Sequence, residues 1–306
     1  MWSYTLRRLV ATLPTLLAVI TVSYFLLHAA PGGPFDSDRN VSEAVLANLN
    51  AKYHLDQPTW KQYLYYLDNL IHGDLGASFR YADWSVNDLV AKALPVSLSI
   101  GGTAMLVSLV LGIALGTLAA LRQNSIADYA LMLVSNLGSV VPSFVIGPVL
   151  VLVFALWLHW LPAGGWDNFA WQYMLLPIVL LTLINVATIG RVMRGSLIEV
   201  MHSNFIRTAR AKGLPTLTVV VRHAFKPALL PVVSVVSPLA ISSITAALVT
   251  ETVFNLPGIG KLIVNGAANR DYTLVLGLVV LITVIAVTLN LLVDLAYAAL
   301  DPKIRY

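Results

Sequence analysis

The chain has 306 residues, of which 58% are hydrophobic and 11% are charged, and its formal net charge is +4. Soluble domains carry about 25% charged residues, so the composition excludes an ordinary soluble protein. There are no cysteines, which excludes disulfides, thiolate metal sites and a cysteine nucleophile. The basic residues do not alternate with aromatic residues on a polar domain, so we expect no nucleic-acid partner.

Six apolar stretches are long enough, or nearly so, to cross the roughly 30 Å hydrocarbon core of a bilayer as helices. None contains Asp, Glu, Lys or Arg, and they cover residues 9–29, 94–121, 129–158, 172–190, 228–250 and 272–293. The third is overlong and contains Pro142 and Pro148, so we expect a kink or tilt there. The sequence therefore predicts an all-α membrane protein with six transmembrane helices in contact with membrane lipid.

The first apolar stretch has two interpretations. Arg7 and Arg8 precede it and His28-Ala29-Ala30 follows it, as in a signal peptide. Its apolar run is longer than that of a typical signal peptide, and Pro31 adjoins the possible cleavage position. Because five more stretches follow, we predict that residues 1–30 form a retained anchor helix.

The basic residues predict the orientation of the helices. Placing both termini in the cytoplasm puts twelve of the nineteen Lys and Arg inside and eleven of the fifteen acidic residues outside. The twelve are Arg7, Arg8, Arg122, Arg191, Arg194, Arg207, Arg210, Lys212, Arg222, Lys226, Lys303 and Arg305. Residues 93–294 then form the membrane core, and residues 295–306 form a cytoplasmic tail.

Residues 31–92 are the only sizeable region predicted to lie outside the cytoplasm. Ser42 and Glu43 suit a helix start, and a second amphipathic helix is predicted to begin near Pro58 and to end at Gly73. About 60 residues with two such helices are too few for an independent catalytic domain, so we expect a small helical cap on the bundle.

A polar segment, residues 198–231, interrupts the apolar chain. It overlaps a predicted cytoplasmic loop that covers residues 196–227. Ser203 can cap a helix, Gly213 can end it and Pro215 prevents its continuation, which predicts a helix over about 204–212 and a second from Thr216. A mere connector needs only a few residues, so this length favours a docking surface. A basic helix lying on anionic headgroups is the alternative.

Glu251 stands at the end of the fifth apolar stretch, where a carboxylate is costly unless it is paired or faces water. It could line the outer mouth of a pathway, cap a re-entrant turn, or lie among headgroups. We favour a structural role in a short scoop-like loop at the outer gate, formed by Glu251, Asn255, Pro257 and Gly258.

Motifs for catalysis are missing from the sequence. Gly260-Lys261 lacks the following Ser/Thr and the leading glycine of a phosphate loop, and no two histidines stand four residues apart. Gly112 and Gly116 form a G-x-x-x-G pair, which we interpret as ordinary close packing of helices. We therefore expect no catalytic residue, metal site or cofactor in this chain.

Several segments resemble ATP-binding-cassette importer permeases of the peptide branch, which includes oligopeptide, dipeptide and nickel importers. RTARAKG followed by RHAFKPALLP resembles the cytoplasmic loop of these permeases, in which a Glu-Ala-Ala…Gly signature occurs. Arg207, Thr208 and Ala209 take the Glu-Ala-Ala positions, where the first two differ, and Gly213 takes that of the glycine. GDLGASF, ETVFNLPGIG, NGAANRDY and DPKIRY extend the resemblance over nearly the whole chain, and it is strongest to oligopeptide permeases.

The resemblance implies the type I importer permease fold in the bacterial inner membrane. It implies a heterodimer with a second homologous permease subunit, two ATPase subunits that hold ATP and Mg, and an extracytoplasmic binding protein that delivers peptide. The ATPase-coupling loop would comprise Phe205, Ile206, Arg207, Thr208, Ala209, Arg210, Ala211, Lys212, Gly213 and Leu214. We expect Phe205, Ile206 and Leu214 to supply apolar seating, and the basic side chains to meet acidic groups on the ATPase.

Two other functions fit the sequence less well. A secondary transporter or channel usually places ionisable groups near the bilayer midplane, and the apolar stretches contain no Asp, Glu, Lys or Arg. An intramembrane enzyme needs a catalytic set within the spans, and only His28 and His159, both near span ends, are candidates. The sequence therefore predicts a permease subunit that forms half of the pathway of an ATP-driven oligopeptide importer and is not itself an enzyme.

Overall fold

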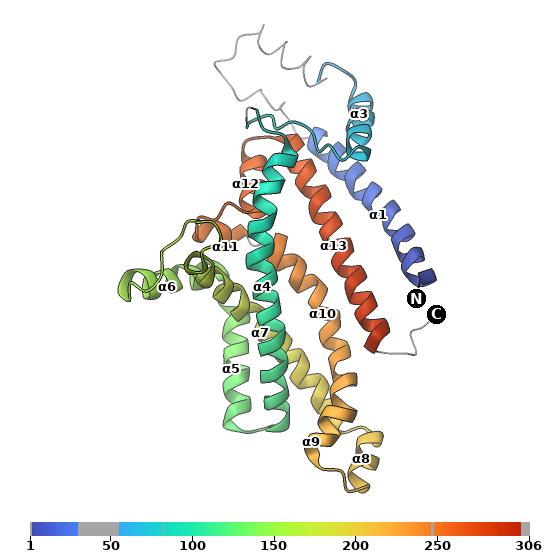
Figure 1. Ribbon diagram of the computed structural model, residues 1–306, viewed down its shortest axis with the longest axis vertical. Coiled ribbons are helices and arrows are strands. Elements are labelled where there is room, and N and C mark those ends of the chain that lie inside the picture. Colours follow the sequence, from blue (N-terminus) through green and yellow to red (C-terminus); the bar gives the residue numbers. More distant parts are fainter. Residues whose placement is uncertain (1, 30–54, 82, 246–247, 301–306) are drawn as a thin grey trace. The chain divides into compact units, whose positions relative to one another are not determined.

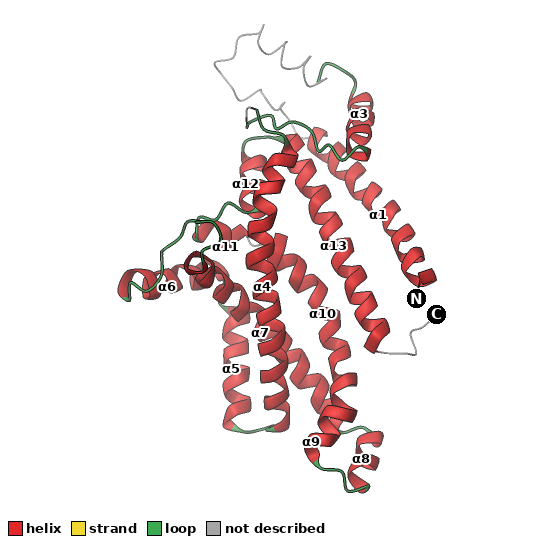
Figure 2. Cartoon of the chain, in the orientation of Figure 1, coloured by secondary structure: helices red, strands yellow, loops and turns green. Residues whose placement is uncertain are grey.

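The structure is a computed structural model that describes residues 2–29, 55–81, 83–245 and 248–300. Apart from one isolated bridge between Ala77 and Ser85, the regular elements of these residues are helices (Figure 2). They are α1 (Trp2–Ala29), α3 (Thr59–Ile71), α4 (Val86–Leu121), α5 (Ile126–Val140), α6 (Ser143–Leu150), η1 (Val151–Trp157), α7 (Trp171–Met201), α8 (Asn204–Ala211), α9 (Thr216–Val219), η2 (Val220–Ala224), α10 (Phe225–Thr245), α11 (Leu248–Val253), α12 (Ile259–Ala268) and α13 (Tyr272–Leu300) (Figure 1).

Within the described residues, five helices are long and apolar enough to cross a membrane. They are Val10–Ala29, Val86–Leu121, Trp171–Met201, Thr216–Val253 and Tyr272–Leu300, and each contains most of one predicted stretch. The all-α membrane class is confirmed. One boundary differs markedly, because α7 continues to Met201 instead of ending at 190. No proline interrupts residues 191–201, so Arg191 and Arg194 lie on the helix.

The third predicted stretch is broken, where we expected only a kink or tilt. Its two parts are α5 and the continuous segment Ser143–Trp157, and Pro142 between them is extended, with φ −61° and ψ 143°. Proline lacks an N–H and disfavours helical geometry at the residue before it, which explains the break at 141–142. Pro148 lies inside α6, and the π-helix η1 follows it.

The chain forms two compact units, and the larger comprises residues 2–5, 96–245, 248–256 and 286–300 of the described chain. At its centre α7 packs against α5 and α10. The G-x-x-x-G pair lies where α4 approaches α7, and a Cβ added to Gly116 would come within 2.5 Å of the Gly190 carbonyl oxygen. The close packing that we predicted for this pair is therefore present.

The second unit comprises residues 6–29, 55–95 and 257–285 of the described chain. Its buried core joins Val86 and Leu89 at the start of α4 to Ile259 of α12 and Leu274 and Leu278 of α13. The predicted second cap helix is α3, and Gly73 after it has a φ of +77°, as a left-handed helix end requires. The first predicted cap helix, near 42–53, lies outside the described residues.

Candidate functional site

The cytoplasmic loop predicted for docking contains α8, which begins and ends within a residue of expectation. Ser203 occupies the N-cap position, but its hydroxyl donates to the Val200 carbonyl oxygen at 2.6 Å and does not cap the helix. The predicted side-chain cap is therefore wrong. At the other end Gly213 has a φ of +77° and its N–H donates to the Arg210 carbonyl oxygen at 2.9 Å. Pro215 then stands at the N-cap of α9, as the predicted restart at Thr216 requires.

One face of α8 is buried within the chain itself. Ile206 is fully buried and Ala209 nearly so, in a cluster with Leu197 at the end of α7 and Val219 of α9. Leu214 packs against the same cluster. Ile206, which we had expected to contact a partner, is instead an anchor that fixes α8 to its own unit. Leu214 is only partly buried, and its contact with a partner stays a prediction.

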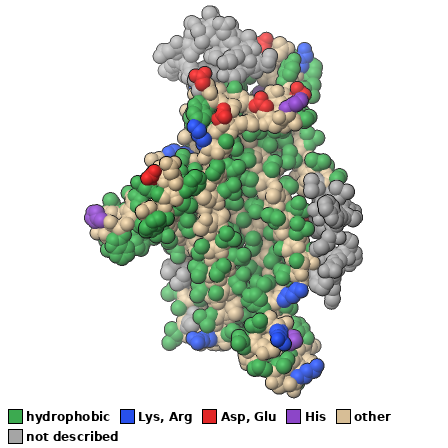
Figure 3. All heavy atoms as spheres, in the orientation of Figure 1, with side chains coloured by type: hydrophobic (Ala, Val, Ile, Leu, Met, Phe, Trp, Pro, Cys, Tyr) green, Lys and Arg blue, Asp and Glu red, His purple; other side chains and the backbone are tan. Residues whose placement is uncertain are grey.

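The other face of the loop is exposed and combines apolar with basic side chains. Phe205 is 50% exposed, and Leu217 of α9 and Val221 of η2 are 74% and 61% exposed. Arg207, Thr208, Arg210, Ala211, Lys212 and Gly213 are exposed as well. Figure 3 shows Lys and Arg side chains gathered around this end of the larger unit. Large apolar side chains among cations are typical of an interaction surface.

A helix leads from this surface into a predicted membrane span. Here α9 passes through the π-helix η2 into α10, and these elements belong to the candidate membrane span Thr216–Val253. Val219, Val220 and Ala224 are buried, and η2 packs on α7. A displacement of the exposed loop would therefore reach the spans through packed side chains.

Glu251, the candidate gate residue, is buried in α11 with 2% of its surface exposed. Its Oε1 accepts a hydrogen bond of 2.7 Å from the Ser97 hydroxyl on α4. The Leu256 N–H donates to the Glu251 carbonyl oxygen at 2.8 Å, which closes the turn after α11. A buried carboxyl with a side-chain donor is the arrangement expected of a structural residue, and it disagrees with a location among headgroups.

The other three gate candidates belong to the turn after α11 and to the start of α12. Asn255 is exposed and has a φ of +50°, so it supplies the left-handed backbone conformation in the turn after α11. Pro257 and Gly258 belong to the second unit, where Gly258 stands at the N-cap of α12. Their assignment to a gate stays a prediction.

Asp128 of α5 and Arg194 of α7 form an ion pair that we did not predict from the sequence. Arg194 donates to both carboxylate oxygens of Asp128, from Nε at 2.5 Å and from Nη2 at 2.7 Å, and the Asn124 N–H adds a bond of 2.9 Å. Asp128 is buried and precedes the third apolar stretch. The hydrogen bonds from Arg194 hold the pKa of the Asp128 carboxyl below its usual range.

Asp271 forms a second buried polar junction that the sequence did not reveal. Its carboxylate accepts hydrogen bonds from the Ser78 hydroxyl at 2.5 Å, from the Phe79 N–H at 3.2 Å and from the Leu274 N–H at 3.1 Å. It thereby caps the start of α13 and fixes residues 78 and 79 to it. The residues lie in GDLGASF and NGAANRDY, two segments that carried the family resemblance.

Known families match nearly the whole chain. Residues 112–306 match the family described as binding-protein-dependent transport system inner membrane component, and residues 1–101 match the N-terminal region described for such membrane components. Two relatives are named oligopeptide transport system permease protein OppB, one from Haemophilus influenzae at 54% identity and one from Escherichia coli strain K12 at 52% identity. Both alignments cover the full length of both chains.

A solved structure shares the fold. Inward-facing conformations of the MetNI methionine ABC transporter align with a TM-score of 0.58 at 16% identity, over 70% of this chain and 96% of that one. At this identity the likeness concerns the fold alone. It agrees with the importer permease fold that the sequence predicted.

Proposed function

The chain belongs to the binding-protein-dependent transport system inner membrane component family, and from that premise we propose that it is a permease subunit of an ATP-driven oligopeptide importer. It is a multi-pass protein of the bacterial inner membrane and, by family, not an enzyme. The proposal rests on a sequence identity of 52% or more, over the full length of both chains, to proteins named as oligopeptide permeases.

On this proposal, different subunits form the pathway, bind ATP and deliver the peptide. This chain would form half of the pathway together with a second homologous permease. Two ATPase subunits would hold ATP and Mg on the cytoplasmic side, and a binding protein would deliver peptide from outside. The absence of Asp, Glu, Lys and Arg from the six apolar stretches supports a pathway that passes many side chains, because fixed charges would select among peptides.

The exposed face of the loop is our proposed ATPase-docking surface, formed by Phe205, Leu217 and Val221 with the basic residues of α8. Exposed ion pairs contribute only about 0–1 kcal/mol each, so apolar contacts should provide most of the affinity. Buried Ile206 and Ala209 support this docking by holding α8 against α7 and α9. Both termini, on the same proposal, lie in the cytoplasm.

Transport is the direct test of the proposed function. A strain that lacks this chain should lose uptake of a radiolabelled pentapeptide and regain it when the wild-type gene is supplied. Restored uptake of a labelled amino acid or sugar, without uptake of the pentapeptide, would contradict the assignment to peptides.

Docking can be tested separately from transport. The double variant Phe205→Ala, Leu217→Ala should retain less co-expressed ATPase during purification in mild detergent. The matched control is Ile126→Ala, because Ile126 is 88% exposed at the start of α5 but lies outside the docking surface. Equal retention by both variants would rule out the assigned surface.

A further inference from the structure

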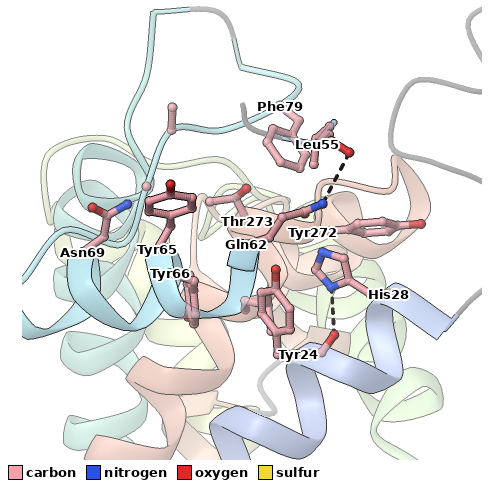
Figure 4. A pocket seen from close by; sticks show the side chains of 13 residues that line it. Tyr24, His28, Leu55, Gln62, Tyr65, Tyr66, Asn69, Phe79, Tyr272 and Thr273 are labelled. Carbon is pink, nitrogen blue, oxygen red and sulfur yellow. Dashed lines mark hydrogen bonds between the residues drawn. The ribbon is translucent and has the colours of Figure 1, made fainter. Parts of the chain in front are cut away.

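A pocket of about 290 Å³ lies within the second unit, among α1, α3, the segment at 76–79 and the start of α13. No part of the proposed transport cycle uses it. Six of the side chains that line it carry aromatic rings: Tyr24, His28, Tyr65, Tyr66, Phe79 and Tyr272 (Figure 4). The Tyr24 and His28 rings stack with centroids 4.1 Å apart, and Tyr66 and Tyr272 each approach this pair at 5.7 Å.

The lining has no formal charge. Among the described residues around the pocket none is Asp, Glu, Lys or Arg. A phosphate or carboxylate would find no cation there, and a divalent metal would find no carboxylate. The available attraction comes from the faces of the rings, which carry partial negative charge and favour organic cations.

Two polar atoms add acceptors for N–H groups. His28 Nδ1 lies 2.8 Å from the Tyr24 carbonyl oxygen, which can only accept, so the proton is on Nδ1 and the neutral ring keeps a lone pair on Nε2. In Figure 4 this second nitrogen points away from that carbonyl, toward the side of Gln62. The Tyr66 hydroxyl is buried and has no hydrogen-bond partner among the residues that the structure describes.

We propose that this pocket binds an organic ammonium group. The rings would surround the cation, while His28 Nε2 and the Tyr66 hydroxyl oxygen would accept its N–H groups. Tyr24 and His28 stand in the last two turns of the span Val10–Ala29, so the pocket lies at the end of a membrane span. Two sources can present an ammonium there, the headgroup of phosphatidylethanolamine and the N-terminus of a peptide.

Binding to the purified complex of the full chain with its partner subunits tests the proposal. The probes are dioleoyl phosphatidylethanolamine, measured by native mass spectrometry, and trialanine, measured by calorimetry, each against its N-acetylated form. At least one ammonium probe should bind at least about tenfold more tightly than its acetylated form, and Tyr65→Leu should weaken that binding roughly fivefold to thirtyfold. Trp60→Leu is the control, since Trp60 is an exposed ring of the same helix outside the pocket.

Tyr66→Phe keeps the ring and removes only the hydroxyl, and we expect it to weaken binding about threefold with unchanged tryptophan fluorescence. Binding of the lipid alone, or of the peptide alone, would identify the source of the ammonium. Binding of neither probe, equal binding of the acetylated forms, or affinities unchanged in both tyrosine variants would overturn the proposal. These measurements are independent of uptake, so they distinguish this proposal from that of peptide transport.

Discussion

The α8 loop and the Asp271 junction differ in the distance along the chain over which their contacts are made. In the loop, helix ends depend on residues a few positions apart, such as Gly213 and Arg210. At the junction, Asp271 binds Ser78 and Phe79, which are 193 and 192 residues away. Features with local causes can be predicted from a sequence, whereas the buried junction depends on the tertiary fold. Substitutions at the two regions should therefore differ in kind and in size.

Asp271→Ala should have the largest effect, because it leaves three donors without their acceptor in a buried site. We expect the free energy of unfolding to fall by roughly 3 kcal/mol or more, measured by SDS titration with tryptophan fluorescence. Asp68→Ala is the control in the same unit, since the Asp68 side chain is 72% exposed. A loss at Asp271 no larger than at Asp68 would show that the junction does not stabilise the fold.

Arg194→Ala tests the ion pair with Asp128, whose two residues stand 66 positions apart, farther than the contacts of the α8 loop and closer than those of the Asp271 junction. It leaves the Asp128 carboxylate buried without its cation, which should cost roughly 2 kcal/mol near neutral pH. The cost should depend on pH, because the folded protein holds the pKa of Asp128 below its unfolded value of about 3.9. The stabilisation is complete above the unfolded pKa and disappears as pH falls through the folded pKa.

The wild type should therefore begin to lose its advantage over Arg194→Ala as the pH falls below the unfolded pKa of about 3.9, and should lose it completely once the pH is below the folded pKa. Unfolding titrations of both proteins across this range measure the difference. A constant difference at every pH would mean that Arg194 stabilises the protein by packing and not through the carboxylate.

Gly213→Val should have the smallest effect on stability and a clear effect on transport. A Cβ at Gly213 would meet no atom within 4 Å, so its cost of about 1–2 kcal/mol comes from the positive φ alone. Strain at this turn should shift the end of α8 and lower peptide uptake. Gly195→Ala is the control, because Gly195 also has open space but lies inside α7. Normal uptake by Gly213→Val would contradict a role for this turn in coupling.

Much of the fold could be predicted because its signals are local. The apolar stretches located the spans, and Gly213 and Pro215 located the end of α8. Local signals also failed at Ser203, where two hydrogen bonds compete for one hydroxyl. The hydroxyl donates to the preceding turn, at the end of α7, and does not cap α8. At Pro142 the sequence predicted a disturbance and understated its size, since the helix breaks there.

The site could be predicted only in part, because burial is a property of the assembled chain. Ile206 and Phe205 are adjacent apolar residues in the sequence, yet one is fully buried and the other is half exposed. Glu251 was singled out, but its donor Ser97 stands 154 residues away. The aromatic pocket combines residues from four segments, so no single motif could indicate it. The domain limits at residues 30, 92 and 294 stay predictions.

Reconstitution tests most directly whether this chain provides the passage while other subunits provide the energy. Proteoliposomes would contain either this chain alone or this chain with its partner permease, both ATPases and the binding protein, each with ATP at the cytoplasmic side. Our account predicts accumulation of labelled peptide against its gradient only in the complete set. Accumulation by the single chain would contradict it.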